Sequence, residues 1–201
     1  MMRRLSVVAC LLSLAAPAWS TTVPKPHARP MAVAKPAAVK PALPDSAAVL
    51  ALLAGVHNGA CPLPGVATGG QPEAAHVAAL AKAGFRTMLD LRAADEPRGF
   101  DEDAAMKAAG VRYLKVPVTP ATLDDGVFDQ VRKLMNETGG KGVFVHCASG
   151  NRVGAALIPW LVLDQGWDVE RAVTAAKAGG LKSAEMEAKA REYISRQRAR
   201  R

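Results

Sequence analysis

A buried strand, a short polar loop and a hydrophobic helix follow one another directly in this chain, and this order strongly limits the possible folds. Residues 142–146 form an apolar, β-rich run, residues 147–152 include Ser, Gly and Asn, and residues 153–165 are strongly apolar. In open α/β sheets, ligands bind beyond the carboxyl ends of the strands. We therefore expect a binding site in the loop of residues 147–152.

Strands and helices alternate through the rest of the central sequence. We expect strands at residues 65–68, 85–91, 111–118 and 142–146, and helices at residues 71–83, 101–109, 122–137, 153–165, 169–178 and from Ser183 onward. Thr122 is expected to cap its helix, with Asp125 at the capping-box position. The alternation predicts an α/β fold with a mostly parallel central sheet of about four to five strands, flanked by helices.

The net charge of +8 lies at the two ends of the chain. Residues 1–45 carry a net charge of +5 and residues 182–201 carry +4, whereas residues 46–181 carry −1. A near-neutral body argues against a nucleic-acid partner. Half of the residues are hydrophobic, which excludes a disordered chain, and 3 cysteines are too few for a disulfide scaffold.

The N-terminus is typical of an exported protein. Arg3 and Arg4 precede an apolar run at residues 5–16, and small residues favour signal-peptide cleavage after Ser20. The apolar run is shorter than the roughly 20 residues of a membrane-spanning helix, so no transmembrane segment is expected after cleavage. We interpret residues 1–20 as a signal peptide to the periplasm and residues 21–45 as a linker rich in Pro, Ala and Lys. Residues 46–181 are the expected folded domain, and residues 182–201 a basic C-terminal helix with a solvated end.

Cys147 and Arg152 bracket the loop in a pattern that suits nucleophilic attack on an anionic group. The helix that follows offers unpaired N–H groups and a dipole that favour an anion and stabilise a cysteine thiolate. Arg152 can bind a tetrahedral oxyanion through two parallel hydrogen bonds, and Gly150 lets the main chain approach the anion closely. The sequence thus predicts a nucleophile, an anion cradle and an electrostatic clamp. The alternative is a structural cysteine at a strand end.

The run from His146 to Arg152 resembles the phosphate-binding loop of the cysteine-dependent, dual-specificity-like protein phosphatases. The longer pattern is similar to a bacterial branch, the phosphatase-like domain of beta-lactamase hydrolase-like proteins and the phosphatase domain fused to NAD kinase. Residues 69–72, 80–92 and 109–118 and Glu96 support this resemblance, which covers about residues 65–165. It implies a protein-tyrosine-phosphatase-like fold.

The resemblance also implies the roles of the site residues. Cys147 would form a phosphocysteine during hydrolysis of a phosphate monoester, and Arg152 would bind the phosphate together with the loop amides. His146 is expected to orient the loop through hydrogen bonds to the backbone rather than to act as a base. The other implied phosphate-binding residues are Ala148, Ser149, Gly150, Asn151 and Val153. The substrate would be a phosphorylated small molecule or a phosphoprotein. No cofactor is expected, and no metal-ligand spacing is present.

The sequence departs from the family pattern at three places. Four residues rather than five separate Cys147 from Arg152, a loop size found in rhodaneses and also in the bacterial branch. Val153 replaces the Ser or Thr that normally follows the arginine. Thr119 and Pro120 stand where the general-acid aspartate is expected.

Three carboxylates are candidates for the missing general acid: Asp124, Asp95 and Glu96. Capping of the next helix explains Asp124 and its neighbour Asp125 at least as well. Without an acid, protonation of the leaving group loses a factor of about 10² to 10⁴, and poor activity on alkyl phosphates is expected.

Two other classes of function fit the same loop. A rhodanese-like sulfurtransferase would carry a persulfide on Cys147, and a non-catalytic module would only bind an anion there. Cys61 adds a redox question, because a disulfide between Cys61 and Cys147 in an oxidising compartment would block the nucleophile.

Overall fold

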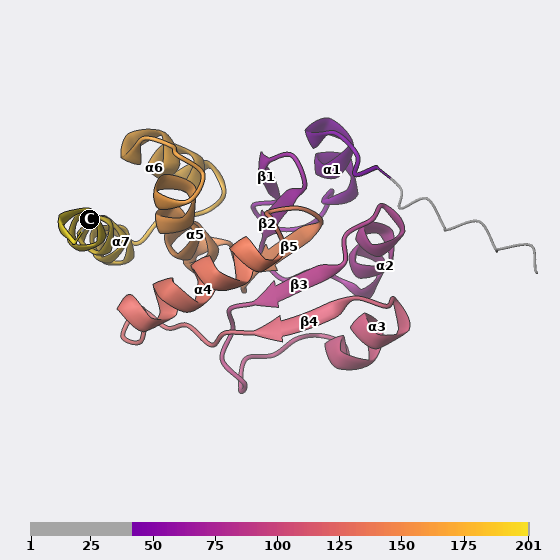
Figure 1. The fold of residues 1–201 in the computed structure, drawn as a ribbon. Helices are drawn as coiled ribbons and strands as arrows, with labels where there is room; N and C mark the ends of the chain where they lie inside the picture. The colour runs from indigo at the N-terminus through magenta and orange to yellow at the C-terminus, as the bar shows by residue number, and fades with distance from the viewer. Residues whose placement is uncertain (1–41, 201) are drawn as a thin grey trace, which may run out of the picture. The chain divides into compact units, whose positions relative to one another are not determined.

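The computed structural model of the chain describes residues 42–200. The predicted signal peptide and all but the last residues of the predicted linker lie outside the described residues. A five-stranded sheet forms the centre of the described part, with helices on both faces (Figure 1). The strands are β1 (Ala60–Leu63), β2 (Val66–Gly69), β3 (Thr87–Asp90), β4 (Arg112–Lys115) and β5 (Val143–His146). The helices are α1 (Ser46–Leu52), α2 (Ala74–Lys82), α3 (Glu102–Ala108), α4 (Asp125–Glu137), α5 (Asn151–Leu163), α6 (Val169–Ala178) and α7 (Ala184–Ala199).

The sheet has the order β1-β2-β5-β3-β4, and only the β1–β2 pair is antiparallel. The prediction of an α/β fold with a mostly parallel sheet is therefore confirmed. Strand β5 lies at the centre, between β2 and β3, so the loop that follows it leaves the middle of the carboxyl edge. Helix α1 and strand β1 were not expected. Strand β1 is the short hairpin partner of β2 at the edge of the sheet, and such a strand carries little periodic signal.

Alternating residues of β5 serve two separate hydrophobic cores, since successive side chains of a strand point to opposite faces. Val143 and Val145 pack in the core shared with α4, α5, α6 and α7. Phe144 packs in the core shared with α1, α2 and α3. Because every residue of β5 is buried, the site at its end stands on a rigid base.

The start of α4 differs from the sequence prediction. Asp124, not Thr122, caps this helix, and its Oδ1 accepts the amide of Val127 at 3.0 Å. The Thr122 hydroxyl instead accepts the amide of Thr119 at 2.8 Å. Hence the turn at residues 119–122 is held by two threonines before the helix begins.

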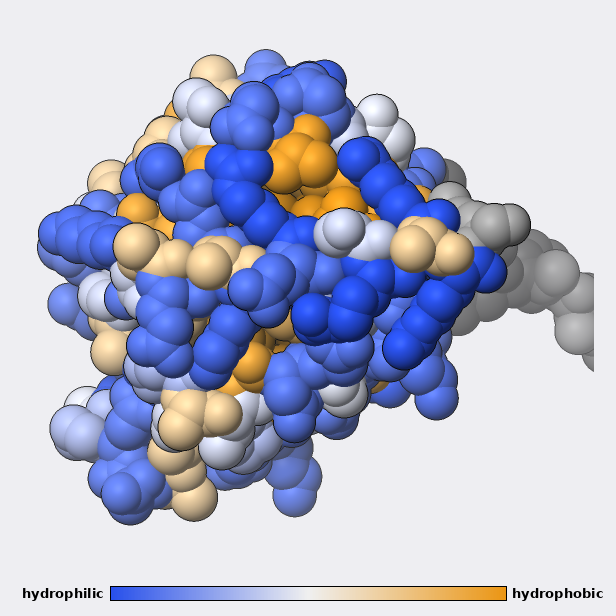
Figure 2. All heavy atoms as spheres, turned by 90° about the vertical axis from the view of Figure 1, so that its left-hand side faces the viewer, coloured by the Kyte–Doolittle hydropathy of each residue, from blue (hydrophilic) through white to orange (hydrophobic). Residues whose placement is uncertain are grey.

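Helix α7 packs on the larger core through one face, while its last residues, from Arg198 to Arg200, are exposed. Met186, Ala190, Tyr193 and Ile194 belong to the larger core, while many of the charged side chains of α7 form ion pairs at its surface. Figure 2 views the side on which α6 and α7 lie and shows a mostly hydrophilic surface, with hydrophobic residues visible mainly in recesses. Within residues 42–200, no helix has the length and apolarity that crossing a membrane requires.

Candidate active site

The loop between β5 and α5 holds Cys147 beneath the first turn of the helix. The thiol is 1% exposed, and the amide of Gly150 donates to its sulfur at 3.1 Å. Gly150 has φ of 87°, and a Cβ there would lie 2.4 Å from the carbonyl oxygen of Gly179. Only glycine satisfies both constraints, so the turn that aims an N–H at the sulfur depends on this residue.

The main-chain N–H groups of the loop form a cradle. Within residues 42–200, no protein acceptor is recorded for the amides of Ala148, Ser149, Asn151, Arg152 and Val153. The last three belong to the first turn of α5, where a helix always leaves N–H groups without intrahelical partners. Together with the helix dipole, these donors suit a tetrahedral anion.

Distant parts of the chain fix this cradle from behind. The side-chain amide of Asn58 donates to the carbonyl of Ser149 at 2.8 Å, and the amide of Gln71 donates to that of Ala148 at 3.2 Å. The side-chain oxygen of Asn151 accepts the amides of Lys182 and Ser183 at 2.8 and 3.1 Å. These contacts hold the cradle in one geometry before any ligand binds.

Arg152 is oriented by an end-on ion pair with Glu96. Its two terminal nitrogens donate to the two carboxylate oxygens at 2.5 and 2.6 Å, and Nη1 also reaches the carbonyl of Val118 at 3.1 Å. A guanidinium has five N–H donors. The two that remain, on Nε and Nη2, share one edge, which is the bidentate fork that binds a phosphate. Glu96 therefore leaves the anion-binding edge of Arg152 open.

The same pair fixes the charge state of both groups. The hydrogen bond from Arg152 lowers the pKa of Glu96 against the opposing effect of burial. The hydrogen bonds to Glu96 raise the pKa of Arg152, and burial opposes this. Glu96 is thus ionised at neutral pH, which suits an anchor for Arg152 and not a proton donor.

The other two general-acid candidates are placed differently. Asp124 is exposed, and its side chain caps α4 by accepting the amide of Val127. Asp95 is exposed, and no hydrogen bond of its side chain is recorded within the described part of the chain. The structure therefore brings Glu96 to Arg152, gives Asp124 a capping contact, and leaves Asp95 exposed beside Glu96.

A network of buried charged side chains lies next to the loop that carries Glu96. Arg92 donates to Asp90 at 2.9 Å and to Glu102 at 2.5 Å, and Tyr113 donates to both carboxylates. Arg98 donates to Asp90 at 3.0 Å and also to the carbonyls of residues 93, 94 and 96. The loop that carries Glu96 is therefore tied to the buried network through Arg98.

Three buried side chains of this region offer potential metal ligands. Ligand atoms of Asp90, Glu102 and His146 lie within 4.8 Å of one another. Both carboxylates, however, already pair with Arg92 and Arg98. Two guanidinium charges balance the two carboxylates, so the cluster has no excess negative charge to hold a cation.

His146 does not orient the loop in the predicted way. Its imidazole is 0% exposed, and neither ring nitrogen has a hydrogen-bond partner among residues 42–200. It stacks on Phe144 with ring centroids 5.4 Å apart, and burial lowers its pKa to about 4. The prediction of hydrogen bonds from its side chain was therefore wrong, and His146 is a neutral packing residue at neutral pH.

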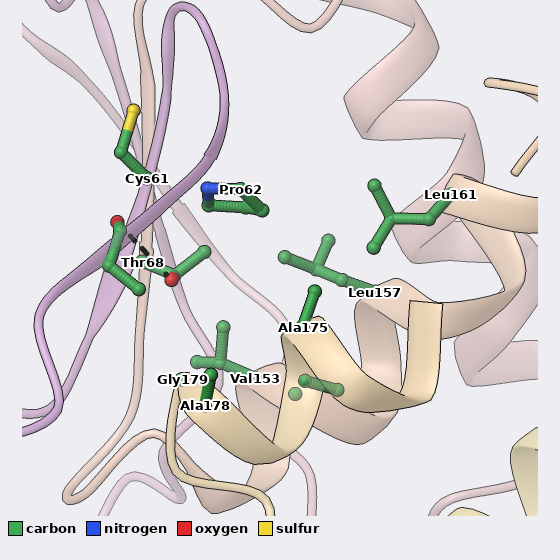
Figure 3. A pocket seen from close by; sticks show the side chains of 12 residues that line it. Cys61, Pro62, Thr68, Val153, Leu157, Leu161, Ala175, Ala178 and Gly179 are labelled. Atoms are coloured by element: carbon green, nitrogen blue, oxygen red, sulfur yellow. Dashed lines mark hydrogen bonds between the residues drawn. The ribbon is translucent and has the colours of Figure 1, made fainter. Parts of the chain in front are cut away.

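A separate apolar cavity of about 190 Å³ lies beside α5. Figure 3 shows Cys61 of β1 on one side, with Val153 and Leu157 of α5 and Ala175 of α6 on the others. The lining contains no charged side chain, so this cavity is not the anion site. Cys61 and Cys147 are both free thiols.

Sequence reasoning missed two residues that support the site. Asn58 meets Ser149 across 91 positions, and Arg98 acts through main-chain carbonyls, so no local pattern identifies either residue. The sequence offers a weak signal for Arg98 only, because this residue closely follows Glu96, which supports the family resemblance.

Comparisons with known proteins agree with this geometry. A family model described as DSP-PTPase phosphatase fused to NAD+ kinase matches residues 64–197. No curated protein matches the chain. Among solved structures, TpbA of P. aeruginosa in complex with pTyr has a TM-score of 0.54 at 24% identity, covering 68% of this chain and 82% of that chain. Tk-PTP has a TM-score of 0.60 at 20% identity, covering 69% and 97%. PTPMT1 has a TM-score of 0.57 at 20% identity, covering 67% and 92%. These likenesses establish a protein-tyrosine-phosphatase-like fold.

Proposed function

The chain belongs to the family described as DSP-PTPase phosphatase fused to NAD+ kinase, and from this premise we propose that it hydrolyses phosphate monoesters through a cysteinyl-phosphate on Cys147. One observation carries the proposal most directly. The sulfur of Cys147 receives the amide of Gly150 at 3.1 Å beneath the unpaired N–H groups of α5. A structural cysteine needs no such donor, whereas a thiolate nucleophile is stabilised by it.

The first chemical step transfers the phosphoryl group to sulfur. The Cys147 thiolate attacks phosphorus, the S–P bond forms, and the ester P–O bond breaks with its electron pair on the leaving oxygen. The N–H groups of the loop and the free edge of Arg152 bind the nonbridging oxygens, where charge shifts in the transition state. The substrate is a phosphorylated small molecule or a phosphoprotein.

The second step regenerates the enzyme. A water molecule attacks the phosphorus of the phosphocysteine, the S–P bond breaks, and inorganic phosphate leaves. The proton of the water passes to phosphate or solvent, and Cys147 returns to its thiolate form. Arg152 keeps its position in both steps because its ion pair with Glu96 uses a different edge of the guanidinium.

Turnover of p-nitrophenyl phosphate tests this proposal. Cys147→Ser should remove activity, and Arg152→Lys should lower it by about 10²-fold or more, because Lys cannot reproduce the bidentate contact. Cys61→Ser is the matched control and should retain the activity of the unsubstituted protein. Turnover by Cys147→Ser at an unreduced rate contradicts the proposal.

Thiosulfate with cyanide as acceptor separates the proposal from a sulfurtransferase. Transfer of sulfur by the protein without turnover of any phosphate ester would replace the phosphatase by the rhodanese-like alternative. Binding of phosphate without either activity would replace it by an anion-binding module.

We further propose that the protein is exported to the periplasm, with cleavage after Ser20. Arg3, Arg4 and the apolar run at residues 5–16 support this. N-terminal sequencing of the protein from a periplasmic fraction should begin at Thr21. Retention of Met1 and of the protein in the cytoplasm would reject export.

A further inference from the structure

We propose that the apolar cavity beside α5 is a second ligand site, which takes a small uncharged molecule of the size of a benzene ring and thereby strengthens anion binding in the cradle. Binding there goes beyond the proposed function, because the cavity can hold such a molecule whether or not Cys147 hydrolyses an ester. The size and lining of the cavity, and the contacts between its walls and the loop of residues 147–152, carry the inference.

The cavity has the volume of a site for one small molecule. It measures about 190 Å³, and its walls come from β1, β2, α5 and α6 (Figure 3). Apolar cavities of about 150 Å³ stay dry in water and bind benzene or xenon. A drug-sized ligand needs a pocket of about 300–1,000 Å³, and an amphipathic helix needs a long groove for several anchoring side chains. A single small molecule is therefore the occupant that fits.

The two polar side chains of the lining are already bonded to the main chain. The thiol of Cys61 donates to the carbonyl of Leu63 at 3.3 Å, and the hydroxyl of Thr68 donates to the carbonyl of Ala60 at 3.4 Å. Among the described residues that line the cavity, none carries a charge. A charged ligand would lose its hydration there without gaining a partner, so the cavity selects uncharged molecules.

The cavity opens between β1 and α6, and α5 forms its floor. The lining residues of β1 are half-buried, and Ala178 at the end of α6 is exposed. Every lining residue of α5 is buried. A ligand therefore enters beside β1, at the edge of the sheet, and packs against α5.

Three lining residues belong to the cradle or touch it. The amide of Val153 is part of the cradle, while its side chain is 1% exposed and lines the cavity. The next lining residue, Gly154, donates its amide to the carbonyl of Gly150 at 2.9 Å. The carbonyl oxygen of Gly179, which also lines the cavity, lies 2.4 Å from the position that a Cβ of Gly150 would take. The cavity and the anion site therefore share the first turn of α5.

A ligand in the cavity stabilises this shared turn in the arrangement that binds an anion. An empty apolar space leaves the side chain of Val153 without contacts on one side. A molecule that packs there restricts the turn in advance, so the anion pays less of the ordering cost when it binds. Because such coupling is reciprocal, an anion in the cradle raises the affinity of the cavity for its ligand by the same factor.

Nuclear magnetic resonance of the full chain with benzene tests the site directly. We expect nuclear Overhauser effects between the ring protons of benzene and the methyl groups of Val153, Leu157 and Leu161. Half-saturation should occur at about 1 mM or below, which is a binding free energy that so small a ligand can reach. Benzylamine has the same ring and a positive charge at neutral pH, and it should give no such contacts.

Two substitutions fill the cavity from different walls. Ala175 of α6 and Ala60 of β1 both line it, so Ala175→Leu and Ala60→Leu should each abolish the contacts with benzene. Circular dichroism checks that each variant is folded. Ala188→Leu makes the same change at an exposed position of α7. This matched control should bind benzene as the unsubstituted protein does.

Calorimetry with inorganic phosphate measures the coupling. We expect the Kd of phosphate to fall about fivefold in saturating benzene, and Ala175→Leu to lose this response. Absence of benzene contacts with the three methyl-bearing residues, or the same contacts in both filled variants, would overturn the inference. An unchanged Kd of phosphate with benzene bound would overturn the coupling. Failure to turn over any phosphate ester would overturn the proposed function alone, because neither binding measurement requires a reaction.

Discussion

Arg152 shows how one side chain can be both fixed and ready to bind. Its terminal nitrogens hold Glu96, while the Nε and Nη2 edge keeps two donors for a ligand. Fixing a long side chain in advance reduces the rotamer entropy lost when a ligand binds. Glu96 is therefore a positioning residue for the proposed phosphate site.

Substitution of Glu96 should weaken binding of phosphate more than it affects stability. In Glu96→Gln the ion pair is lost and Arg152 regains rotamer freedom, so the inhibition constant of inorganic phosphate and KM should rise about tenfold. Competitive inhibition kinetics measure both. Asp95→Asn is the matched control on the neighbouring exposed residue and should change neither value. A loss of kcat confined to weakly acidic leaving groups would instead assign proton donation to Glu96.

The sequence identified Cys147, Arg152 and Gly150 as site residues because the order of strand, loop and helix around them is a local pattern. It named Glu96 only as a candidate general acid and could not predict its ion pair with Arg152, since the two residues lie 56 positions apart. For the same reason it attributed hydrogen bonds to His146. The neighbouring strands decide which face of β5 the His146 side chain lies on. They also decide whether a hydrogen-bond partner is available to it there.

Among the elements, the carboxyl ends of β3 and β5 carry the buried network beside the site. Asp90 is 0% exposed and receives bonds from Arg92, Arg98 and Tyr113. Burial alone would raise the pKa of Asp90, but the hydrogen bonds from Arg92 and the nearby charges lower it to about 2. The loop from Arg92 to Arg98 is anchored by these bonds, so the network also supports Glu96.

This network predicts a specific loss of stability in acid. Because the pKa of Asp90 in the folded protein is depressed from 3.8 to about 2, its contribution of about 2 kcal/mol is present above the ordinary pKa and lost as pH falls toward about 2. Urea unfolding at about pH 7 and about pH 3 measures the difference. In Asp90→Asn this part of the acid sensitivity should disappear. The same dependence in the variant would refute the assignment.

The elements themselves were predicted well where the pattern is periodic. The sequence places α6 at residues 169–178, as observed, and Ser183 caps α7. It misplaced the start of α4, because Thr122 and Asp124 are both good caps and the bond between Thr119 and Thr122 decided between them. It missed β1, whose pairing with β2 is a tertiary contact.

For the described part of the molecule as a whole, α7 closes the larger core. The ring of Tyr193 packs on Phe128 at a centroid distance of 4.9 Å, and its hydroxyl accepts a bond from Arg132 at 2.8 Å. A basic composition concealed this role from the sequence, since the apolar residues of α7 are few and widely spaced. The helix belongs to the same folded unit as the site.

Removing the Tyr193 side chain should therefore destabilise the whole fold. Tyr193→Ala leaves a cavity and removes the hydroxyl that Arg132 and Asp129 contact, so the free energy of unfolding should fall by about 3–5 kcal/mol. Arg198→Ala, an exposed position on the same helix, should change it by less than about 0.5 kcal/mol. Urea unfolding followed by circular dichroism measures both. Equal effects of the two substitutions would mean that α7 does not contribute to the core.

If Cys147 carries the phosphoryl group during turnover, the phosphocysteine can be trapped and detected. The protein is mixed with excess p-nitrophenyl phosphate, quenched in acid within one turnover, digested, and analysed by mass spectrometry. We expect one phosphate on the peptide that contains Cys147 and none in Cys147→Ser. Steady turnover without phosphate on this peptide, or with phosphate on another residue, would contradict it.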